Sequence, residues 1–337
     1  MIFSRSPLRI TFAGGGSDYR EFTQRGGTSN VIGCALDQYV YVMSSPMPSM
    51  ADEPFRFTYR RSEVVHNVNE FLHPVLPAAM NLLRWTTPVN IATMADLPGG
   101  TGLGSSSAFV TALLANLNKF RGERPLTPES LARAAVHVER DILQEPGGVQ
   151  DQYQSAFGGF RHYKFSGNGN CEMSEAIVPK EFLEDLSKSL LLVAQESKRQ
   201  SNQGALRTSQ TVSGGGRVLA EQLSKEAEEL GSQVRMSQSV DELIDHLATS
   251  LSRNWQLKQS LLEKEAGGAE VEEIVSRAVH AGALAGKLCG AGGAGFVLLV
   301  CPPEDRDHIA KHFDNERVVR PSIAEAGTSA HEAEWSG

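Results

Sequence analysis

The residues best suited to chemistry lie in a run of glycines and hydroxyl side chains between Asp96 and Ala108 (DLPGGTGLGSSSA). An extended apolar pattern precedes this run and a helical pattern follows it. Backbone N–H groups at a helix N-terminus are unpaired and carry the positive end of the dipole, and glycines let such a backbone wrap an anion. The run predicts either a phosphate site, where a serine could also bind Mg²⁺, or a glycine-rich turn with a serine cap. It is not a Walker A loop, because no Gly-Lys-Ser/Thr follows.

Two carboxylates lie near another glycine pair. Glu139 falls in a helical pattern, and Asp151 follows the turn at Gly147–Gly148 (EPGGVQDQY). Taken alone, each acid is more often a solvated surface charge than a functional group. In the company of a phosphate loop, both become candidates for the chemistry at that loop.

The first glycine cluster, at residues 14–16, also follows an extended pattern. Asp18 ends this segment and is either a capping residue or a hydrogen-bond partner for substrate hydroxyls. Tyr19 stands where a dinucleotide fingerprint would require its third glycine. The cluster therefore does not predict a dinucleotide site.

The last glycine cluster contains a literal GxGxxG at Gly290, Gly292 and Gly295. A dinucleotide fingerprint needs a strand before it and a helix after it. Here a helical pattern over residues 270–287 comes first and a buried strand over residues 296–301 follows, so we reject a dinucleotide site. The cluster is then either a tight helix-to-strand turn or a loop packed against the phosphate loop.

The elements that must position these residues follow from hydrophobic periodicity. Extended patterns, interrupted at Pro7, cover residues 2–3, 8–13, 31–43, 55–59 and 88–95. A strong helical pattern covers residues 106–120. The next predicted helix has Thr127 as its N-cap and Pro128 at its first position, and it stops before Pro146.

The character of the chain changes near residue 160. Residues 158–169 are polar and glycine-rich, so we place a domain boundary there, between residues 1–165 and 166–337. The second part then continues with a strand over residues 189–194, helical patterns over 203–230, 240–265 and 270–287, the strand over 296–301 and a polar C-terminal tail.

Composition excludes several classes of function. The chain has 337 residues, enough for about two domains. Its net charge is −8 and it has no basic block, which argues against a nucleic acid or an anionic membrane as partner. Its 4 cysteines form no CxxC pair, so neither a zinc ribbon nor a disulfide framework is indicated. No apolar run fits a bilayer span or a signal peptide, and we expect a cytoplasmic protein.

Four segments together resemble the GHMP kinases, the superfamily of galactokinase, homoserine kinase, mevalonate kinase and phosphomevalonate kinase. They occur in the order of that family: SPLRITFAGGGSD from Ser6, PGGTGLGSSSA from Pro98, GGVQDQ from Gly147 and KLCGAGGAG from Lys287. The resemblance covers essentially the whole chain. It implies an α+β fold of two domains, an N-terminal domain with a left-handed βαβ unit and a C-terminal ferredoxin-like domain.

Within this superfamily, the chain is most similar to the D-glycero-D-manno-heptose 7-phosphate kinases. The similarity lies in the opening run Leu8–Asp18 and in the central segment from Glu139 to Phe160. Galactokinases carry Gly-Glu-His-Thr-Asp where this chain has the four residues from Gly15 to Asp18. The missing Glu-His pair argues against galactose as the substrate.

The resemblance implies that the second glycine cluster binds the phosphates of ATP. The residues assigned to this loop are Pro98, Gly99, Gly100, Thr101, Gly102, Leu103, Gly104, Ser105, Ser106 and Ser107. Ser106 and Glu139 correspond to the residues that hold Mg²⁺ in the family, with Ser105 and Ser107 as alternatives to Ser106. Oxygen ligands from one or two side chains, together with ATP phosphates, are what Mg²⁺ prefers.

The resemblance also assigns the catalytic pair and the acceptor site. Asp151 corresponds to the catalytic base, and Arg9 to a cation that would lower the pKa of Asp151 and stabilise the transferring group. The residues assigned to substrate binding are Gly15, Gly16, Ser17, Asp18, Arg199 and Gly292. The candidates for holding a phosphate on the substrate are Arg20, Lys198, Arg199 and Arg207.

The implied reaction transfers the γ-phosphoryl group of ATP to the anomeric C1 hydroxyl of D-glycero-D-manno-heptose 7-phosphate. Its product, the 1,7-bisphosphate, would serve nucleotide-activated heptose and cell-surface polysaccharide synthesis. The small sugar phosphate is then the partner, and the sequence gives no oligomeric state. The alternatives are another sugar 1-kinase of the fucose or galactose type, and a catalytically silent sensor of ATP or sugar. Retention of Arg9, Ser106, Glu139 and Asp151 together argues against a silent protein.

Overall fold

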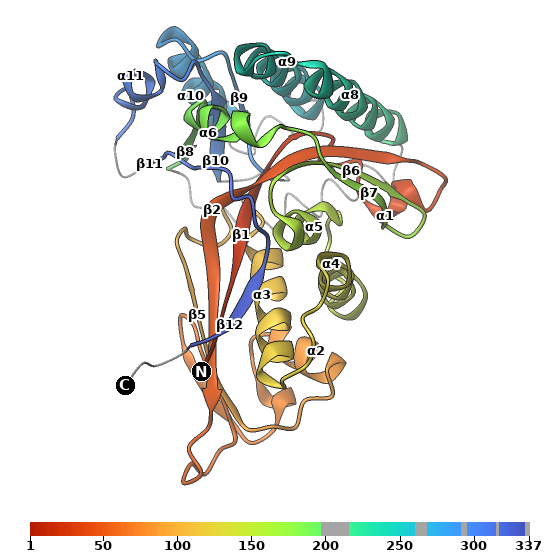
Figure 1. The fold of residues 1–337 in the computed structure, drawn as a ribbon, viewed down its shortest axis with the longest axis vertical. Helices are drawn as coiled ribbons and strands as arrows, with labels where there is room; N and C mark the ends of the chain where they lie inside the picture. Colours follow the sequence, from red (N-terminus) through yellow and green to blue (C-terminus); the bar gives the residue numbers. More distant parts are fainter. Residues whose placement is uncertain (197–215, 260–267, 291–294, 315–316, 334–337) are drawn as a thin grey trace.

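The computed structural model describes residues 1–196, 216–259, 268–290, 295–314 and 317–333. Its strands form two sheets, with helices packed on both, and the larger sheet runs through the centre and lower part of Figure 1. None of the helices in the described ranges has the length and apolarity that a membrane span requires.

Long antiparallel strands form the centre of the larger sheet. β1 (Ile2–Ala13) pairs with β2 (Ser29–Pro46), and β2 pairs with β5 (Val89–Ala95). β3 (Phe55–Thr58) lies parallel to β5 and antiparallel to β4 (Ser62–Val65). The connection from β3 to β5 contains β4, the short helix η1 (Val68–Glu70) and the helix α2 (Val75–Leu82).

β1 runs without a break through Pro7, where the sequence predicts an interruption. Pro7 pairs with Tyr39, and the register of the ladder shifts between Pro7 and Arg9. A proline has no N–H to donate and is tolerated where a ladder is irregular. The prediction of two separate strands is therefore wrong, and a single strand bears Arg9 and leads directly to the first glycine cluster.

The polar segment predicted as a boundary loop is a strand of the larger sheet. β6 (Phe160–Ser166) pairs with the first half of β2 and with β7 (Asn170–Ala176). Its buried Phe160, Tyr163 and Phe165 lie among polar neighbours, and this interleaving made the segment look like a loop. The larger sheet thus continues beyond residue 165, and the division into 1–165 and 166–337 stays a prediction.

The C-terminal end also differs from the expected polar tail. β12 (Ser329–Glu332) pairs antiparallel with the first residues of β1, with Ile2 opposite Glu332. Main-chain hydrogen bonds hold this edge strand, and its polar side chains gave no apolar signal in the sequence. The two ends of the described chain therefore meet on one edge of the larger sheet (Figure 1).

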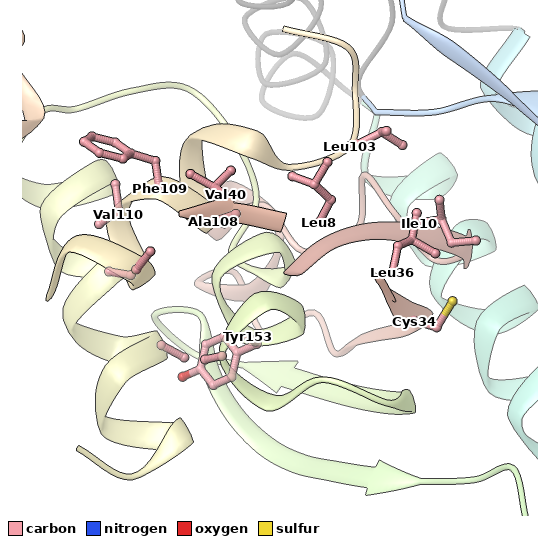
Figure 2. Packing of buried hydrophobic residues seen from close by; sticks show 14 of the residues in the cluster. Leu8, Ile10, Cys34, Leu36, Val40, Leu103, Ala108, Phe109, Val110 and Tyr153 are labelled. Atoms are coloured by element: carbon pink, nitrogen blue, oxygen red, sulfur yellow. The ribbon is translucent and has the colours of Figure 1, made fainter. Parts of the chain in front are cut away.

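Helices cover one face of the larger sheet (Figure 1). They include α3 (Ser105–Phe120), α4 (Pro128–Val136) and α5 (Gln150–Phe157). Thr127 caps α4, as predicted, because its side chain accepts a hydrogen bond from the N–H of Ser130 at 3.2 Å. The core lies between this sheet and its helices; the residues labelled in Figure 2 are Leu8, Ile10, Cys34, Leu36, Val40, Leu103, Ala108, Phe109, Val110 and Tyr153.

The smaller sheet has the strand order β11-β8-β10-β9. Its strands are β8 (Leu190–Ala194), β9 (Ala285–Leu288), β10 (Phe296–Val300) and β11 (Val318–Val319). The helices of this part are α6 (Lys180–Lys188), α8 (Arg217–Met236), α9 (Val240–Gln259), α10 (Gly268–His280) and α11 (Arg306–Ala310). α9 contacts both β9 and β1, so it joins the two sheets beside the first glycine cluster.

The helix predicted over residues 270–287 ends early. α10 stops at His280, Gly282 takes a φ of 111°, and β9 begins at Ala285. A positive φ at glycine terminates a helix without strain. β9 and β10 pair antiparallel, so the last glycine cluster joins two strands and is not a helix-to-strand turn.

Candidate active site

A cavity of about 1540 Å³ lies where the glycine clusters meet. Its walls come from the end of β1, the segment before α3, the start of α5 and the end of α9. All of the residues predicted for ATP phosphates except Leu103 line it, and so do Arg9, Glu139 and Asp151. The structure therefore brings together residues that are far apart in the sequence.

The second glycine cluster needs its glycines for shape and for space. Gly102 has a φ of 78°, and a Cβ there would lie 2.5 Å from the carbonyl oxygen of Cys289. Gly104 has a φ of 74° and stands at the N-cap of α3, where a Cβ would meet the Arg9 side chain at 3.1 Å. The loop thus places the N-terminus of α3 at the cavity, as a phosphate site requires.

The last glycine cluster packs against this loop. Of the two alternatives for that cluster, a tight turn or a loop against the phosphate loop, the structure confirms the second. The N–H of Phe296 donates to the carbonyl of Thr101 at 3.1 Å, and a Cβ at Gly290 would lie 2.8 Å from Gly102 Cα. A Cβ at Gly295 would lie 2.5 Å from the carbonyl oxygen of Thr101. Gly292, predicted to bind substrate, lies outside the described residues.

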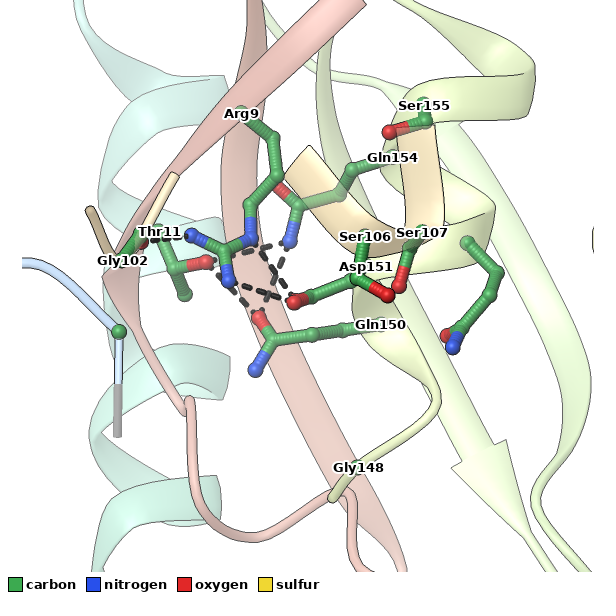
Figure 3. A network of polar contacts seen from close by, with 12 residues as sticks. Arg9, Thr11, Gly102, Ser106, Ser107, Gly148, Gln150, Asp151, Gln154 and Ser155 are labelled. Carbon is green, nitrogen blue, oxygen red and sulfur yellow. Dashed lines mark hydrogen bonds and ion pairs between the residues drawn. The ribbon is translucent and has the colours of Figure 1, made fainter. Parts of the chain in front are cut away.

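Arg9 and Asp151 form a bidentate ion pair in this cavity (Figure 3). Arg9 Nε donates to Asp151 Oδ1 at 2.8 Å and Nη2 donates to Oδ2 at 2.6 Å. The third guanidinium nitrogen, Nη1, donates to the carbonyl of Gly102 at 2.6 Å. Arg9 is only 7% exposed, but Asp151 is 24% exposed, so the carboxylate is the member of the pair that a substrate can reach.

The pair fixes the charge of Asp151. Burial would raise the pKa of this carboxyl, but the charge and hydrogen bonds of Arg9, together with smaller contributions from nearby cations, hold the pKa below its ordinary value. Arg140 and Lys258 act in the same direction. This is the effect that the family resemblance implies for Arg9.

Glu139 faces the serines that begin α3. Ser106 Oγ donates to its Oε1 at 2.9 Å and Ser107 Oγ donates to its Oε2 at 2.8 Å, while Gln152 Nε2 also donates to Oε2. Glu139 is almost fully buried and lies in a π-helical turn, His137–Ile142. Such turns often occur at functional sites. Ser106 and Ser107 thus both lie beside the carboxylate, whereas Ser105 makes no hydrogen bond to it.

Asp18 links the first glycine cluster to the start of α5. Its carboxylate accepts hydrogen bonds from the backbone N–H groups of Gly16 and Gln150, at 3.1 and 3.0 Å, and from Gln150 Nε2 at 3.1 Å. Burial raises the pKa of Asp18, and these hydrogen bonds only partly oppose the effect. Ser17 is turned away, since its Oγ bonds Gly14 and Ser29. Contact between Asp18 and a sugar hydroxyl stays a prediction.

Of the cations predicted for a substrate phosphate, only Arg20 lies in the described part of the chain. Arg20 pairs with Asp141, which also bonds His137, and Arg20 does not line the cavity. Lys198, Arg199 and Arg207 lie outside the described residues.

The sequence reasoning missed two cavity lysines. Lys258 lies near the end of α9, and Lys287 lies in β9. A signal existed for Lys258, because it follows Leu247, Leu251 and Asn254 along the buried face of α9, where the pattern calls for an apolar residue.

The far end of the cavity is aromatic. Tyr59, His73 and Phe109 line it, with edge-to-face ring contacts between His73 and the other two. His73 Nδ1 is buried without a hydrogen-bond partner in the described part of the chain, and burial lowers the pKa of this histidine. A flat, partly polar group such as a nucleobase matches this chemistry, and the sequence reasoning did not find it.

Two family models match the chain. The model described as the N-terminal domain of GHMP kinases matches residues 69–159, and the model described as GHMP kinases C terminal matches residues 240–318. The D-glycero-α-D-manno-heptose 7-phosphate kinase of Campylobacter jejuni is 24% identical over 94% of each chain. A mevalonate kinase of Methanothermobacter thermautotrophicus is 27% identical over 74% of this chain and 76% of that protein.

Solved structures give the same fold. A D-glycero-D-manno-heptose 1-phosphate kinase from Bacteroides thetaiotaomicron matches with a TM-score of 0.76 over 99% of this chain and 100% of that chain, at 21% identity. The galactokinase of Lactococcus lactis, complexed with galactose, matches with a TM-score of 0.71 over 98% and 95%, at 12% identity. At these identities the likeness shows the fold alone, and it confirms the predicted α+β class.

Proposed function

This chain belongs to the GHMP kinases, and on that basis we propose that it phosphorylates the anomeric C1 hydroxyl of D-glycero-D-manno-heptose 7-phosphate. Members of the family use ATP to phosphorylate alcohols, so the chain is a phosphotransferase with a small-molecule acceptor. The proposed product is the 1,7-bisphosphate. The sugar follows the C. jejuni relative, a heptose 7-phosphate kinase that this chain matches over 94% of its length.

One observation carries the proposed reaction site. Arg9 donates two hydrogen bonds to Asp151 and a third to the carbonyl of Gly102 in the second glycine cluster. The ion pair is thus attached to the loop assigned to ATP and leaves the carboxylate accessible from the cavity. An acceptor hydroxyl placed beside Asp151 would lie close to the end of a nucleotide held by that loop.

In the proposed step, the C1 oxygen forms a bond to the γ-phosphorus of ATP as the bond from that phosphorus to the bridging oxygen breaks, and ADP leaves. Asp151 accepts the proton of the hydroxyl. A carboxylate with a lowered pKa is a weak base, but the loose transition state of phosphoryl transfer asks mainly for a positioned nucleophile. An anomeric hydroxyl is more acidic than an ordinary alcohol, which further lightens the demand.

We propose that Glu139 and Ser106 hold Mg²⁺, with Ser107 as the alternative serine. The donor set fits, because a buried carboxylate and two hydroxyls supply hard oxygen ligands beside the start of α3. The ion would neutralise charge on the ATP phosphates when bound. The residues of the chain orient these oxygens, and Gln152 steadies Glu139 by donating to its Oε2.

The test is a panel of acceptors with ADP release as the readout. It contains D-glycero-D-manno-heptose 7-phosphate, the same heptose without phosphate, galactose, fucose and mevalonate. We expect the heptose 7-phosphate to give the largest kcat/KM, with the new phosphate on C1 by phosphorus NMR. Turnover of galactose or fucose without turnover of heptose 7-phosphate would replace the proposed sugar, and product phosphorylated elsewhere would replace the proposed position.

A further inference from the structure

We propose that Lys258, near the end of α9, binds the phosphate already carried by the acceptor, so that the enzyme selects a sugar phosphate over a neutral sugar. This inference rests on the proposed function and assigns a specificity residue to it. The two amines of the cavity, the half-buried Lys258 and the buried Lys287, are the features that the mechanism above does not use.

The register of α9 directs Lys258 into the cavity. Leu247, Leu251 and Asn254 form the buried side of the helix, and Lys258 follows one turn after Asn254 on that side. Its Nζ would lie 3.4 Å from a Cβ on Gly15, so the amine sits directly over the first glycine cluster. The same glycine borders Thr11 and the side-chain amide of Gln150.

Lys258 has no carboxylate partner among the described residues. Within the described ranges its Nζ makes one long hydrogen bond, to the carbonyl of Gly290 at 3.5 Å. Asp151 is bound by Arg9, and Asp18 is occupied by the N–H groups described above. Burial lowers the pKa of Lys258, and the nearby Asp18 offsets this only in part. A bound dianion would stabilise the charged amine that the protein itself leaves uncompensated.

Lys287 adds a second amine to the same region. Its Nζ donates to the carbonyl of Phe12 at 3.0 Å and to Asn254 Oδ1 at 3.3 Å. It is nearly inaccessible, and burial, followed by the charge of Lys258, lowers its pKa well below the ordinary value. An anion bound beside Lys258 would offset the charge that lowers the pKa of Lys287.

The other cations lining the described cavity already have partners or lie elsewhere. Arg9 is committed to Asp151, and Arg140 donates to the carbonyls of Gly148 and Glu145. Arg60 lies near Gly99, at the loop assigned to the nucleotide. Lys258 is thus the lining cation that combines a place over the first glycine cluster with a free charge, and that cluster belongs to the acceptor side.

The experiment compares wild type with Lys258→Met, Lys258→Arg and a control, Lys225→Met, in the full chain. Lys225 lies in α8, pairs with Glu229 at 3.6 Å and is largely exposed, so its removal deletes the same charge outside the cavity. Each protein is assayed with heptose 7-phosphate and with unphosphorylated heptose. Binding of heptose 7-phosphate is also measured by calorimetry in the presence of a non-hydrolysable ATP analogue.

We expect Lys258→Met to raise the KM and Kd for heptose 7-phosphate by about 10- to 100-fold, the usual worth of a charged hydrogen bond. The KM for ATP should change little. Because Lys258 also helps to lower the pKa of Asp151, the activity on unphosphorylated heptose should fall somewhat, but by much less than the activity on heptose 7-phosphate. Lys258→Arg should recover most of the lost affinity, and Lys225→Met should match wild type.

The inference would be overturned if Lys258→Met lost the same factor in kcat/KM on both acceptors, or if it raised the KM for ATP instead. Either result would mean that the amine interacts with the transferred phosphoryl group or with ATP. Unchanged binding of heptose 7-phosphate by Lys258→Met, with turnover by wild type intact, would overturn the inference and leave the proposed function standing. If wild type phosphorylates no sugar, the proposed function fails, yet a selective loss of heptose 7-phosphate binding in Lys258→Met would still support the phosphate site.

Discussion

Asp18 and Asp151 are two carboxylates of one cavity that differ in exposure and in the charge of the groups that donate to them. Both are held by hydrogen bonds from groups with fixed positions, Asp18 by backbone and amide N–H groups and Asp151 by Arg9. The donors around Asp18 are neutral, and burial raises its pKa. The donor to Asp151 carries a full charge, and the pKa of Asp151 is lowered despite burial.

The difference teaches that burial alone does not decide what a carboxylate can do. Asp18 joins the first glycine cluster to the start of α5, and a Cβ at Gly148 would collide with its carboxylate. Asp151 is the second residue of α5, partly exposed to the cavity and held charged by Arg9. We infer that Asp18 has a structural role in the site and that Asp151 takes part in the reaction.

The strongest challenge to this comparison is Asp151→Asn. The variant keeps the shape of the side chain but cannot accept the proton of the acceptor, so we expect kcat to fall about 10²- to 10⁴-fold. Binding of ATP should persist, because the glycine loop is unchanged. Stopped-flow or steady-state ADP release gives kcat, and calorimetry gives the ATP affinity. Near-normal turnover would remove Asp151 from the reaction.

Arg9→Met tests the charge that separates the two carboxylates. Without the guanidinium, burial governs Asp151, its pKa rises, and the charged form is lost as the pH falls. We expect kcat/KM at pH 7 to fall roughly 10²-fold and an acid limb to move to higher pH in the pH–rate profile. Arg9→Lys keeps the charge but loses the fork, so its acid limb should move less. An acid limb at the same pH in all three proteins would contradict the role of Arg9.

Much of this comparison was available in the sequence. The glycine clusters, Glu139 and Asp151 stand out by residue type and order, Arg9 follows from the family resemblance, and the structure gathers them in one cavity. The strands around the phosphate loop and the cap at Thr127 follow from local pattern and turn chemistry. Such features are local, so a single chain reveals them.

The pairing of strands that are far apart in the chain could not be predicted from the sequence. β12 has polar side chains and is held by its pairing with β1, and β6 interleaves apolar with polar residues after two glycines. The partners of Asp18 were equally hidden, because nothing near residue 18 indicates that Gln150 will donate to it. Lys258, in contrast, was detectable in the sequence, because a lysine on the apolar side of a predicted helix indicates a functional residue.

Glu139→Gln extends the comparison to a third carboxylate, one that faces hydroxyls. The amide keeps an acceptor for the serines but removes the charge, so we expect about tenfold more Mg²⁺ to be needed for half-maximal activity. Glu145→Gln is the matched control, because Glu145 lines the same cavity but does not hydrogen-bond to Ser106 or Ser107. A Mg²⁺ titration of activity at saturating ATP measures this requirement in each protein. An unchanged titration in Glu139→Gln would place the metal elsewhere.

The smallest expected effect is on stability, and it separates Asp18 from Asp151 by the direction of its pH dependence. The folded chain binds the proton of Asp18 more tightly than the unfolded chain does, so wild type loses stability as the pH rises from about 4 through the native pKa. Asp18→Asn removes this effect, although it costs about 1 to 3 kcal/mol through an unsatisfied N–H group. The stability difference between wild type and Asp18→Asn should therefore shrink as the pH rises above about 4.

For Asp151 the sign is opposite, because its native pKa is lowered. Its contribution is fully present above about pH 4 and is lost as the pH falls through the native pKa. The difference between wild type and Asp151→Asn should thus be flat above about pH 4 and shrink below it. Urea unfolding of the three proteins from pH 3 to pH 7 measures both slopes. If the two differences changed in the same direction over the same range, the partner charge would not be what distinguishes these carboxylates, and the division between a residue with a structural role and one that takes part in the reaction would lose its physical basis.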